Sequence, residues 1–274
     1  MIDNIPSIIF LWIYMAIIWG NIIQIWKKRP KKISKSWSLL FGAFFLLAFG
    51  DVFHLLPRTY LWYRYSLQNQ IDIYTSSIGV FIYGGGLIMT GITMTFFYLL
   101  FYLFWKEQYI KDIEIPELQR IKGKIKILDI IAYGSIIIRT ILILLPWNKY
   151  GSEPVYYFGI LSFRLLTNFP LYVIGVQVLF LFLKSYNVTK SMNLIHPDIN
   201  KAVKQSSIWI IVSFVTYTFP LLGNHLVPLF GMMMIPKTIA YLIVLYIMKK
   251  LILLNPSLEQ ETQQSISAKN ALTY

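Results

Sequence analysis

Seven apolar stretches follow one another along the chain of 274 residues. A stretch of about 20 apolar residues crosses the hydrocarbon core of a bilayer as an α-helix, whereas membrane barrels show shorter segments of alternating polarity. Such alternation is missing from this sequence. The sequence therefore predicts an all-α integral membrane protein, a seven-transmembrane-helix bundle. The predicted helices cover about residues 6–26, 37–57, 78–105, 126–147, 165–184, 207–225 and 229–250.

The composition excludes a soluble protein and favours one domain over residues 1–256. Hydrophobic residues make up 57% of the chain and charged residues only 14%, against about 25% charged in soluble domains. The polar segments 106–125 and 185–206 are too short for a core of their own and could hold only short interfacial helices. Residues 58–77 are predicted to be an outer loop on the membrane surface or over the bundle. Residues 257–274, rich in Gln, Ser and Glu, are predicted to be a disordered tail.

The net charge of +13 follows a topological pattern. Nineteen of the 25 lysines and arginines fall in residues 27–36, 106–126 and 184–204 or in the C-terminal tail, and the alternate connections carry only four. Basic connections stay in the cytoplasm, so the N-terminus is predicted outside and the C-terminus inside. The charge thus predicts a multi-pass protein of a cell membrane and no nucleic-acid partner. The Ile- and Lys-rich, Ala-poor usage is typical of an AT-rich genome and favours a bacterial inner membrane.

The ionisable residues that lie well inside the predicted helices fall in the outer halves of these helices. The stretch G-D-V-F-H-L-L-P-R places Asp51, His54 and Arg58 on one helical face. A charged side chain at membrane depth costs at least about 2.5–3.5 kcal/mol and usually faces a bundle interior or a watered cavity. The sequence therefore predicts a polar pocket that opens outward and is closed toward the cytoplasm. Its predicted ligand-binding residues are Arg58, Arg139, Arg164, Asn168, Asn224, His225 and Lys237.

The charge balance of this predicted pocket indicates an anionic ligand. Four of its residues are cationic and only Asp51 is acidic, and arginine forks bind phosphate and carboxylate groups in a bidentate manner. The leading hypothesis is a receptor-like or transport component that binds an anionic small molecule or a lipid headgroup. Asp51 and His54 would tune the charge of the pocket and could carry a proton.

Two other functions remain open at this point. In the first, the protein is an intramembrane enzyme acting on a lipid or lipid-linked substrate, with Asp51 and His54 as catalytic acid and base and the cations stabilising a phosphate or an oxyanion. In the second, the protein is structural or an assembly factor. Asp51 then neutralises Arg139 or Lys237, and His54 forms a hydrogen bond with a neighbouring helix.

The sequence predicts no metal and no cofactor. It has no cysteine and only three histidines. Asp51, His54 and His225 could in principle form a three-ligand zinc site, but no H-x-x-x-H or H-E-x-x-H motif is present to anchor it.

Glycines at 84–86 and Gly91 lie in the outer half of the third predicted helix. Glycine in a membrane helix lets a neighbouring backbone approach, or leaves room for a ligand. Both interpretations are open, and helix packing is favoured.

Overall fold

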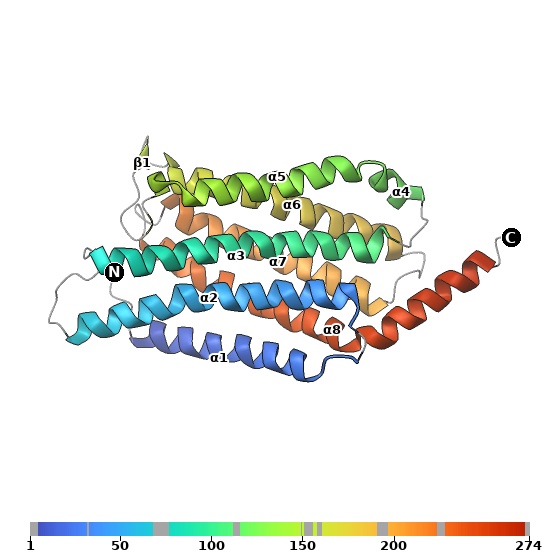
Figure 1. The fold of residues 1–274 in the computed structure, drawn as a ribbon, viewed down its shortest axis with the longest axis horizontal. Coiled ribbons are helices and arrows are strands. Elements are labelled where there is room, and N and C mark those ends of the chain that lie inside the picture. Colours follow the sequence, from blue (N-terminus) through green and yellow to red (C-terminus); the bar gives the residue numbers. More distant parts are fainter. Residues whose placement is uncertain are drawn as a thin grey trace.

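The computed structural model describes residues 5–31, 33–67, 77–111, 116–148, 150, 156–157, 161–190, 197–223 and 228–271. These residues form long helices and one small antiparallel hairpin (Figure 1). In chain order the elements are α1 (Ile5–Lys27), α2 (Lys35–Leu67), α3 (Ser77–Tyr109), α4 (Pro116–Lys122), α5 (Ile125–Leu144), η1 (Pro146–Asn148), β1 (Tyr156–Tyr157), β2 (Leu161–Ser162), α6 (Phe163–Lys190), α7 (Pro197–Gly223), η2 (Pro228–Met233) and α8 (Met234–Ala271).

Six helices are long and apolar enough to cross a membrane: α1, α2, α3, α5, α6 and α7. The protein is therefore a polytopic helical membrane protein. Among the described residues, α8 is not one of the six. A seventh crossing by α8 stays a prediction, as does the orientation in the membrane.

Successive long helices run in alternate directions (Figure 1). The ends of α1, α3 and α6 therefore lie together with the starts of α2, α5 and α7. We call this the basic end of the bundle, because Lys27, Lys35, Lys106, Lys122 and Lys190 lie there, and we call the other the opposite end. The structure thus places at one end the basic segments that the sequence assigned to one side of the membrane.

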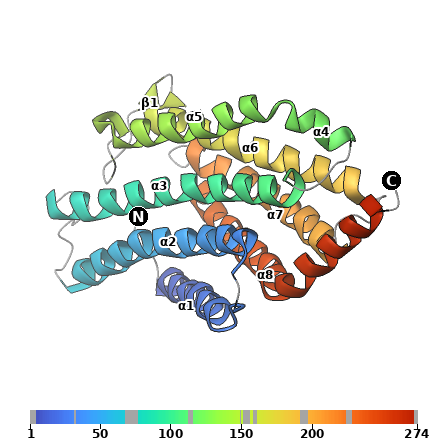
Figure 2. The same ribbon diagram turned by 45° about the vertical axis from the view of Figure 1, so that its right-hand side comes forward.

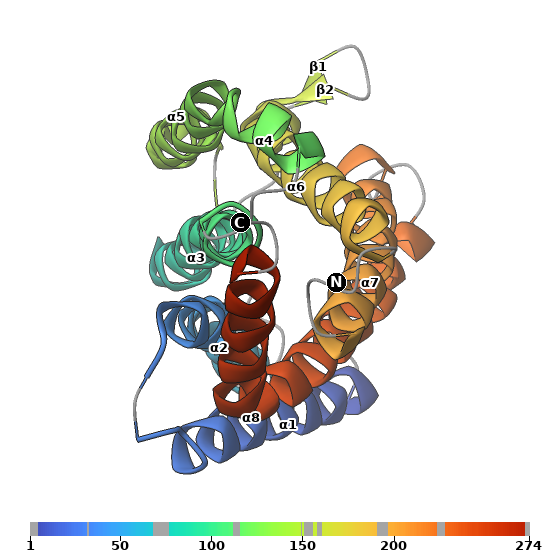
Figure 3. The same ribbon diagram turned by 90° about the vertical axis from the view of Figure 1, so that its right-hand side faces the viewer.

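The long helices surround a shared interior. Seen from the basic end, α2 and α3 lie on one side and α6 and α7 on the other (Figure 3). Below α2, α1 packs against both α2 and α8 (Figure 2). α3 contacts α2, α5 and α6, and it contributes seven large aromatic side chains that are almost completely buried: Phe97, Tyr98, Phe101, Tyr102, Phe104, Trp105 and Tyr109.

The backbones of α2 and α3 come close at Gly86. A Cβ atom at Gly86 would lie 2.1 Å from the carbonyl oxygen of Phe53. Pro57 has no N–H to donate to that carbonyl within α2, so the helix leaves it unpaired where α3 arrives. Gly85, in contrast, has open space at its Cβ position, with nothing within 4 Å. Of the two interpretations of these glycines, helix packing therefore holds for Gly86.

A second close contact joins the same helices one turn closer to the basic end. A Cβ atom at Gly50 would lie 2.0 Å from Oγ1 of Thr93. The hydroxyl of Thr90 donates a hydrogen bond to the carbonyl of Gly50 over 2.9 Å. These contacts hold the face of α2 that carries Asp51 and His54 at a defined position beside α3.

Several helices extend beyond their predicted bounds. α2 continues through residues 58–67, which had been predicted as a loop, because Pro57 removes one hydrogen bond without ending the helix. α7 begins at Pro197 instead of 207, since Ile199, Ala202 and Val203 bury an apolar face along this polar-looking segment.

The tail differs from its prediction as well. α8 is helical to Ala271, where a disordered segment was predicted from residue 257, and its last part projects beyond the bundle (Figure 1). Residues 257–271 contain Leu, Glu, Gln and Ala, which favour helix, and no glycine or proline.

Candidate functional site

Arg139 of α5 lies inside the opposite half of the bundle, with only 3% of its surface exposed. Its Nη1 donates to the hydroxyl of Thr95 on α3 over 2.7 Å, and its Nη2 donates to Oδ1 of Asn168 on α6 over 3.0 Å. The guanidinium therefore joins three helices.

Asn168 extends this contact to α7 and α8. Its Oδ1 also accepts a hydrogen bond from the hydroxyl of Tyr217 on α7 over 3.1 Å. Nζ of Lys237 on α8 lies 3.7 Å from the centre of the Tyr217 ring, a close cation–π contact. We call Thr95, Arg139, Asn168, Tyr217 and Lys237 the cation cluster. Three of its five members were predicted as ligand-binding residues, and the structure brings these three together.

The partners of Arg139 are neutral. Thr95 and Asn168 carry no charge, and its Nε is buried without a hydrogen-bond partner. The groups within electrostatic range of the guanidinium include the phenols of Tyr98, Tyr150, Tyr217 and Tyr241 and no carboxylate. Within the described residues, Arg139 is thus a buried cation without an anionic partner.

Tyr150 does not supply the missing negative charge. It lies outside the helices and near both Arg139 and Arg164, whose charges lower the pKa of its phenol. Burial is the larger effect and raises that pKa above its ordinary value of 10.0. The phenol therefore stays protonated and neutral at physiological pH.

Arg164 lies one turn before Asn168 at the start of α6. Its Nε donates to the backbone carbonyl of Asn148 over 2.8 Å, and its guanidinium lies 5.5 Å from the centre of the Tyr150 ring. The amide of Asn168 donates to the backbone carbonyl of Arg164 over 2.7 Å. Arg164 therefore lies beside the cation cluster and is held by the loop after α5.

Asp51 of α2 is bound by a neighbour that the sequence did not indicate. Its carboxylate accepts a hydrogen bond from the hydroxyl of Tyr14 on α1. Lys237 lies within electrostatic range of this carboxylate, yet the structure shows no direct ion pair between these two described residues. Asp51 therefore acts on Lys237 through its charge without pairing with it, and no contact among the described residues brings it to Arg139.

His54 is not paired with Asp51. Its Nδ1 is buried without a hydrogen-bond partner, and its ring lies 6.4 Å from that of Tyr83. The charges that act on it are those of Arg58 and Lys237. The hydrogen bond from His54 to a neighbouring helix, expected for a purely structural role, is not formed at Nδ1.

Three of these residues are partly accessible although they are surrounded by protein. Asp51, His54 and Lys237 each keep an intermediate exposure while many protein atoms lie around them. Asn224 and His225, also predicted for the site, lie outside the described residues. Among those described, no three His, Cys, Asp or Glu side chains form a group that could hold a metal.

Thr95, Tyr14 and Tyr217 were missed by the sequence analysis. Each is a neutral polar residue inside an apolar helix, and the chain has 19 tyrosines. A tyrosine in a membrane helix commonly lies in the aromatic belt at the membrane surface. The sequence alone therefore does not show which tyrosines contact the charged residues of the site.

No family model, no curated protein and no solved structure matches this chain. The site is therefore defined by its own geometry.

Proposed function

We propose that this polytopic membrane protein binds an anionic small molecule or an anionic lipid headgroup at the cation cluster, as a receptor-like or transport component. Arg139 and Lys237 hold the anion in this proposal. Asp51 sets the charge of the surroundings of Lys237, and Arg164 attracts the anion from the rim.

The observation that carries the proposal is the buried guanidinium of Arg139, whose partners among the described residues are all neutral. A buried charge without a counter-charge costs several kcal/mol, by an order-of-magnitude estimate. The hydrogen bonds that the guanidinium donates to Thr95 and Asn168 compensate part of this cost. An anion bound between Arg139 and Lys237 compensates the rest, and arginine in particular suits carboxylate and phosphate groups.

The access route follows from the distribution of basic residues. The cation cluster lies in the half of the bundle away from the basic end. If basic connections are cytoplasmic, the anion reaches Arg139 and Lys237 from outside the cell. Asp51, His54 and Lys237, which are partly accessible, line the path between the helices.

The test is anion-dependent stabilisation of the purified full-length protein. Its thermal unfolding is followed with inorganic phosphate, with citrate, and with a short-chain phosphatidic acid against the matched phosphatidylcholine. An anion that binds the folded state raises the unfolding midpoint. We expect one of the anions to do so, and Arg139→Met and Lys237→Met each to remove the effect.

The control variant is Lys122→Met, which removes an exposed lysine at the basic end. It should keep the full stabilisation. Equal stabilisation by the same anion in the wild type, Arg139→Met and Lys237→Met would refute the proposed site.

An intramembrane enzyme is the second candidate, and the buried, unpartnered Nδ1 of His54 favours it. An imidazole nitrogen without a partner is available to a substrate as a base or an acid. Asp51 is not its orienting group, because Asp51 accepts from Tyr14 instead. Turnover of a lipid substrate that is lost in His54→Ala but kept in Asp51→Asn would support this candidate over simple anion binding.

A further inference from the structure

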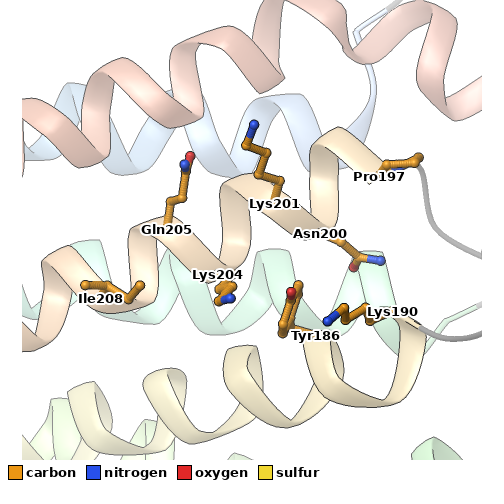
Figure 4. Close-up of a pocket in the computed structure, with 8 residues that line it drawn as sticks. All are labelled: Tyr186, Lys190, Pro197, Asn200, Lys201, Lys204, Gln205 and Ile208. Atoms are coloured by element: carbon orange, nitrogen blue, oxygen red, sulfur yellow. The ribbon is translucent and has the colours of Figure 1, made fainter.

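A cavity of about 510 Å³ opens at the basic end, where α6 ends and α7 begins. Tyr186 and Lys190 line it from α6. The lining residues from α7 are Pro197, Asn200, Lys201, Lys204, Gln205 and Ile208. Figure 4 draws the ring of Tyr186 between the amino groups of Lys190 and Lys204. We call this the lysine pocket. It lies at the other end of the bundle from the cation cluster.

Among the described residues, the lining of the lysine pocket carries positive charge and no carboxylate. Lys190, Lys201 and Lys204 are all exposed, and Nζ of Lys204 lies 5.1 Å from the centre of the Tyr186 ring. Asp198 follows Pro197 in the chain but does not line the pocket. The wall of the pocket is therefore suited to an anionic group.

Asn200 adds a donor to this wall. Its Oδ1 already accepts hydrogen bonds from the hydroxyls of Tyr109, over 3.3 Å, and Thr189, over 2.9 Å. The side-chain NH₂ of Asn200 is a hydrogen-bond donor that this lining residue contributes. Together with the lysine ammonium groups, it makes the pocket a donor-rich site, which suits phosphate oxygens.

An exposed apolar face of α7 continues from the pocket toward the middle of the membrane. Ile208 lines the pocket itself, and Ile211 and Val215 follow it at helical spacing. All three side chains are exposed in the isolated protein. The surface thus passes from cationic to apolar along one helix, as a phospholipid passes from headgroup to acyl chain.

We propose that the lysine pocket binds the phosphate-bearing headgroup of an anionic phospholipid, with the acyl chains along Ile208, Ile211 and Val215. Basic pockets between membrane helices at the cytoplasmic side are suited to such headgroups. A soluble phosphate compound shares the headgroup chemistry, but it leaves the apolar part of the surface unused. The lipid therefore fits both halves of the site. This proposal is independent of the anion proposed for the cation cluster.

The test measures lipid binding to the purified full-length protein by native mass spectrometry. Phosphatidylglycerol and phosphatidylcholine with identical acyl chains are titrated separately. We expect the wild type to bind phosphatidylglycerol more tightly. The triple variant K190Q/K201Q/K204Q should bind it at least about tenfold more weakly, since each lysine near an anionic lipid contributes about fivefold in affinity. Its affinity for phosphatidylcholine should be unchanged.

The matched control is K122Q/K124Q/K126Q, which removes three exposed lysines at the same end of the bundle. It should bind phosphatidylglycerol almost as the wild type does. Equal weakening in both triple variants would mean a diffuse attraction to the basic end and would overturn the pocket. Equal affinities of the wild type for phosphatidylglycerol and phosphatidylcholine would overturn the assignment to an anionic headgroup. If K190Q/K201Q/K204Q is not monodisperse, the double variant K190Q/K204Q replaces it. The double variant K122Q/K126Q is then its control.

Discussion

Two cations lie across the interface between α3 and α5, one in each half of the bundle, and their surroundings differ. In the basic half, Nζ of Lys106 on α3 lies 2.7 Å from Oδ1 of Asp129 on α5, and the hydroxyl of Tyr102 donates to the same oxygen over 2.8 Å. In the opposite half, Arg139 on α5 donates to the neutral side chain of Thr95 on α3. One cation has a carboxylate and the other has none among the described residues.

The difference in burial makes this contrast informative. The side chains of Lys106 and Asp129 are 28% and 29% exposed, so water already screens both charges. Arg139 is 3% exposed. Among the described residues, a carboxylate thus pairs with the cation that water already screens, and none pairs with the cation whose lone charge costs most. A purely structural role for Arg139 would call for the reverse arrangement. The contrast therefore supports a ligand as the missing anion.

The largest effect is expected for Arg139→Met. Loss of one partner of a buried, hydrogen-bonded charge pair costs about 2–5 kcal/mol, so binding of the stabilising anion should weaken thirty-fold or more. Without anion, the same variant should be more stable than the wild type by about 1–4 kcal/mol, because an apolar side chain replaces an uncompensated buried charge. Thermal unfolding with and without the anion measures both effects.

The sign of the second effect separates binding from a structural lock. If Arg139 only holds helices together, Arg139→Met destabilises the protein with and without anion. That outcome would remove the energetic argument for a ligand at the cation cluster.

The next largest effect is expected for Gly86→Ala, which tests how the helices pack in the two halves of the bundle. The basic half is filled by large aromatic side chains of α3, whereas α2 and α3 meet in the opposite half through Gly86 and the carbonyl of Phe53. Gly86→Ala places a methyl group against backbone that cannot yield and should lower the free energy of unfolding by about 1–3 kcal/mol. Gly85→Ala is the matched control, since its Cβ position is open. Equal unfolding midpoints for the two variants would show that α2 and α3 can separate there without cost.

The parts of the fold and of the site that the bilayer itself determines could be predicted from the sequence. Apolar length and the placement of basic residues predict a helical membrane protein and the segregation of charge to one end, because both arise from the bilayer itself. The gathering of Arg139, Asn168 and Lys237 was also predictable, since buried ions must avoid lipid.

Neutral partners were not predictable from the sequence. The structural alternative paired Asp51 with Arg139 or Lys237, yet the hydroxyl of Tyr14 donates to it. Which tyrosine reaches a carboxylate depends on helix rotation and side-chain direction, and the sequence pattern leaves both open. The lysine pocket was missed for another reason: its lysines were explained by topology alone.

Asp51→Asn is expected to have a moderate effect. It removes the carboxylate whose charge acts on Lys237, so the protein should lose about 1–2 kcal/mol of stability without anion. An incoming anion would meet less repulsion, and its affinity should rise by roughly a few-fold. Tyr14→Phe is the control: it removes the hydrogen bond to Asp51 but keeps the charge, so anion affinity should not change. Equal affinity changes in the two variants would show that the charge of Asp51 does not act on the ligand.

The smallest effect is expected for Lys106→Met, at the paired end of the α3–α5 interface. Asp129 keeps the hydroxyl of Tyr102 as a donor and remains partly exposed to water. Loss of a partly exposed ion pair costs about 0.2–1 kcal/mol, and anion-dependent stabilisation should be unaffected. The unfolding midpoint should therefore fall slightly, opposite in sign to that of Arg139→Met without anion. A larger loss of stability for Lys106→Met than for Gly86→Ala would mean that the ion pair stabilises the interfaces of α3 more than close helix packing does. That result would contradict the contrast drawn between the basic half and the opposite half of the bundle.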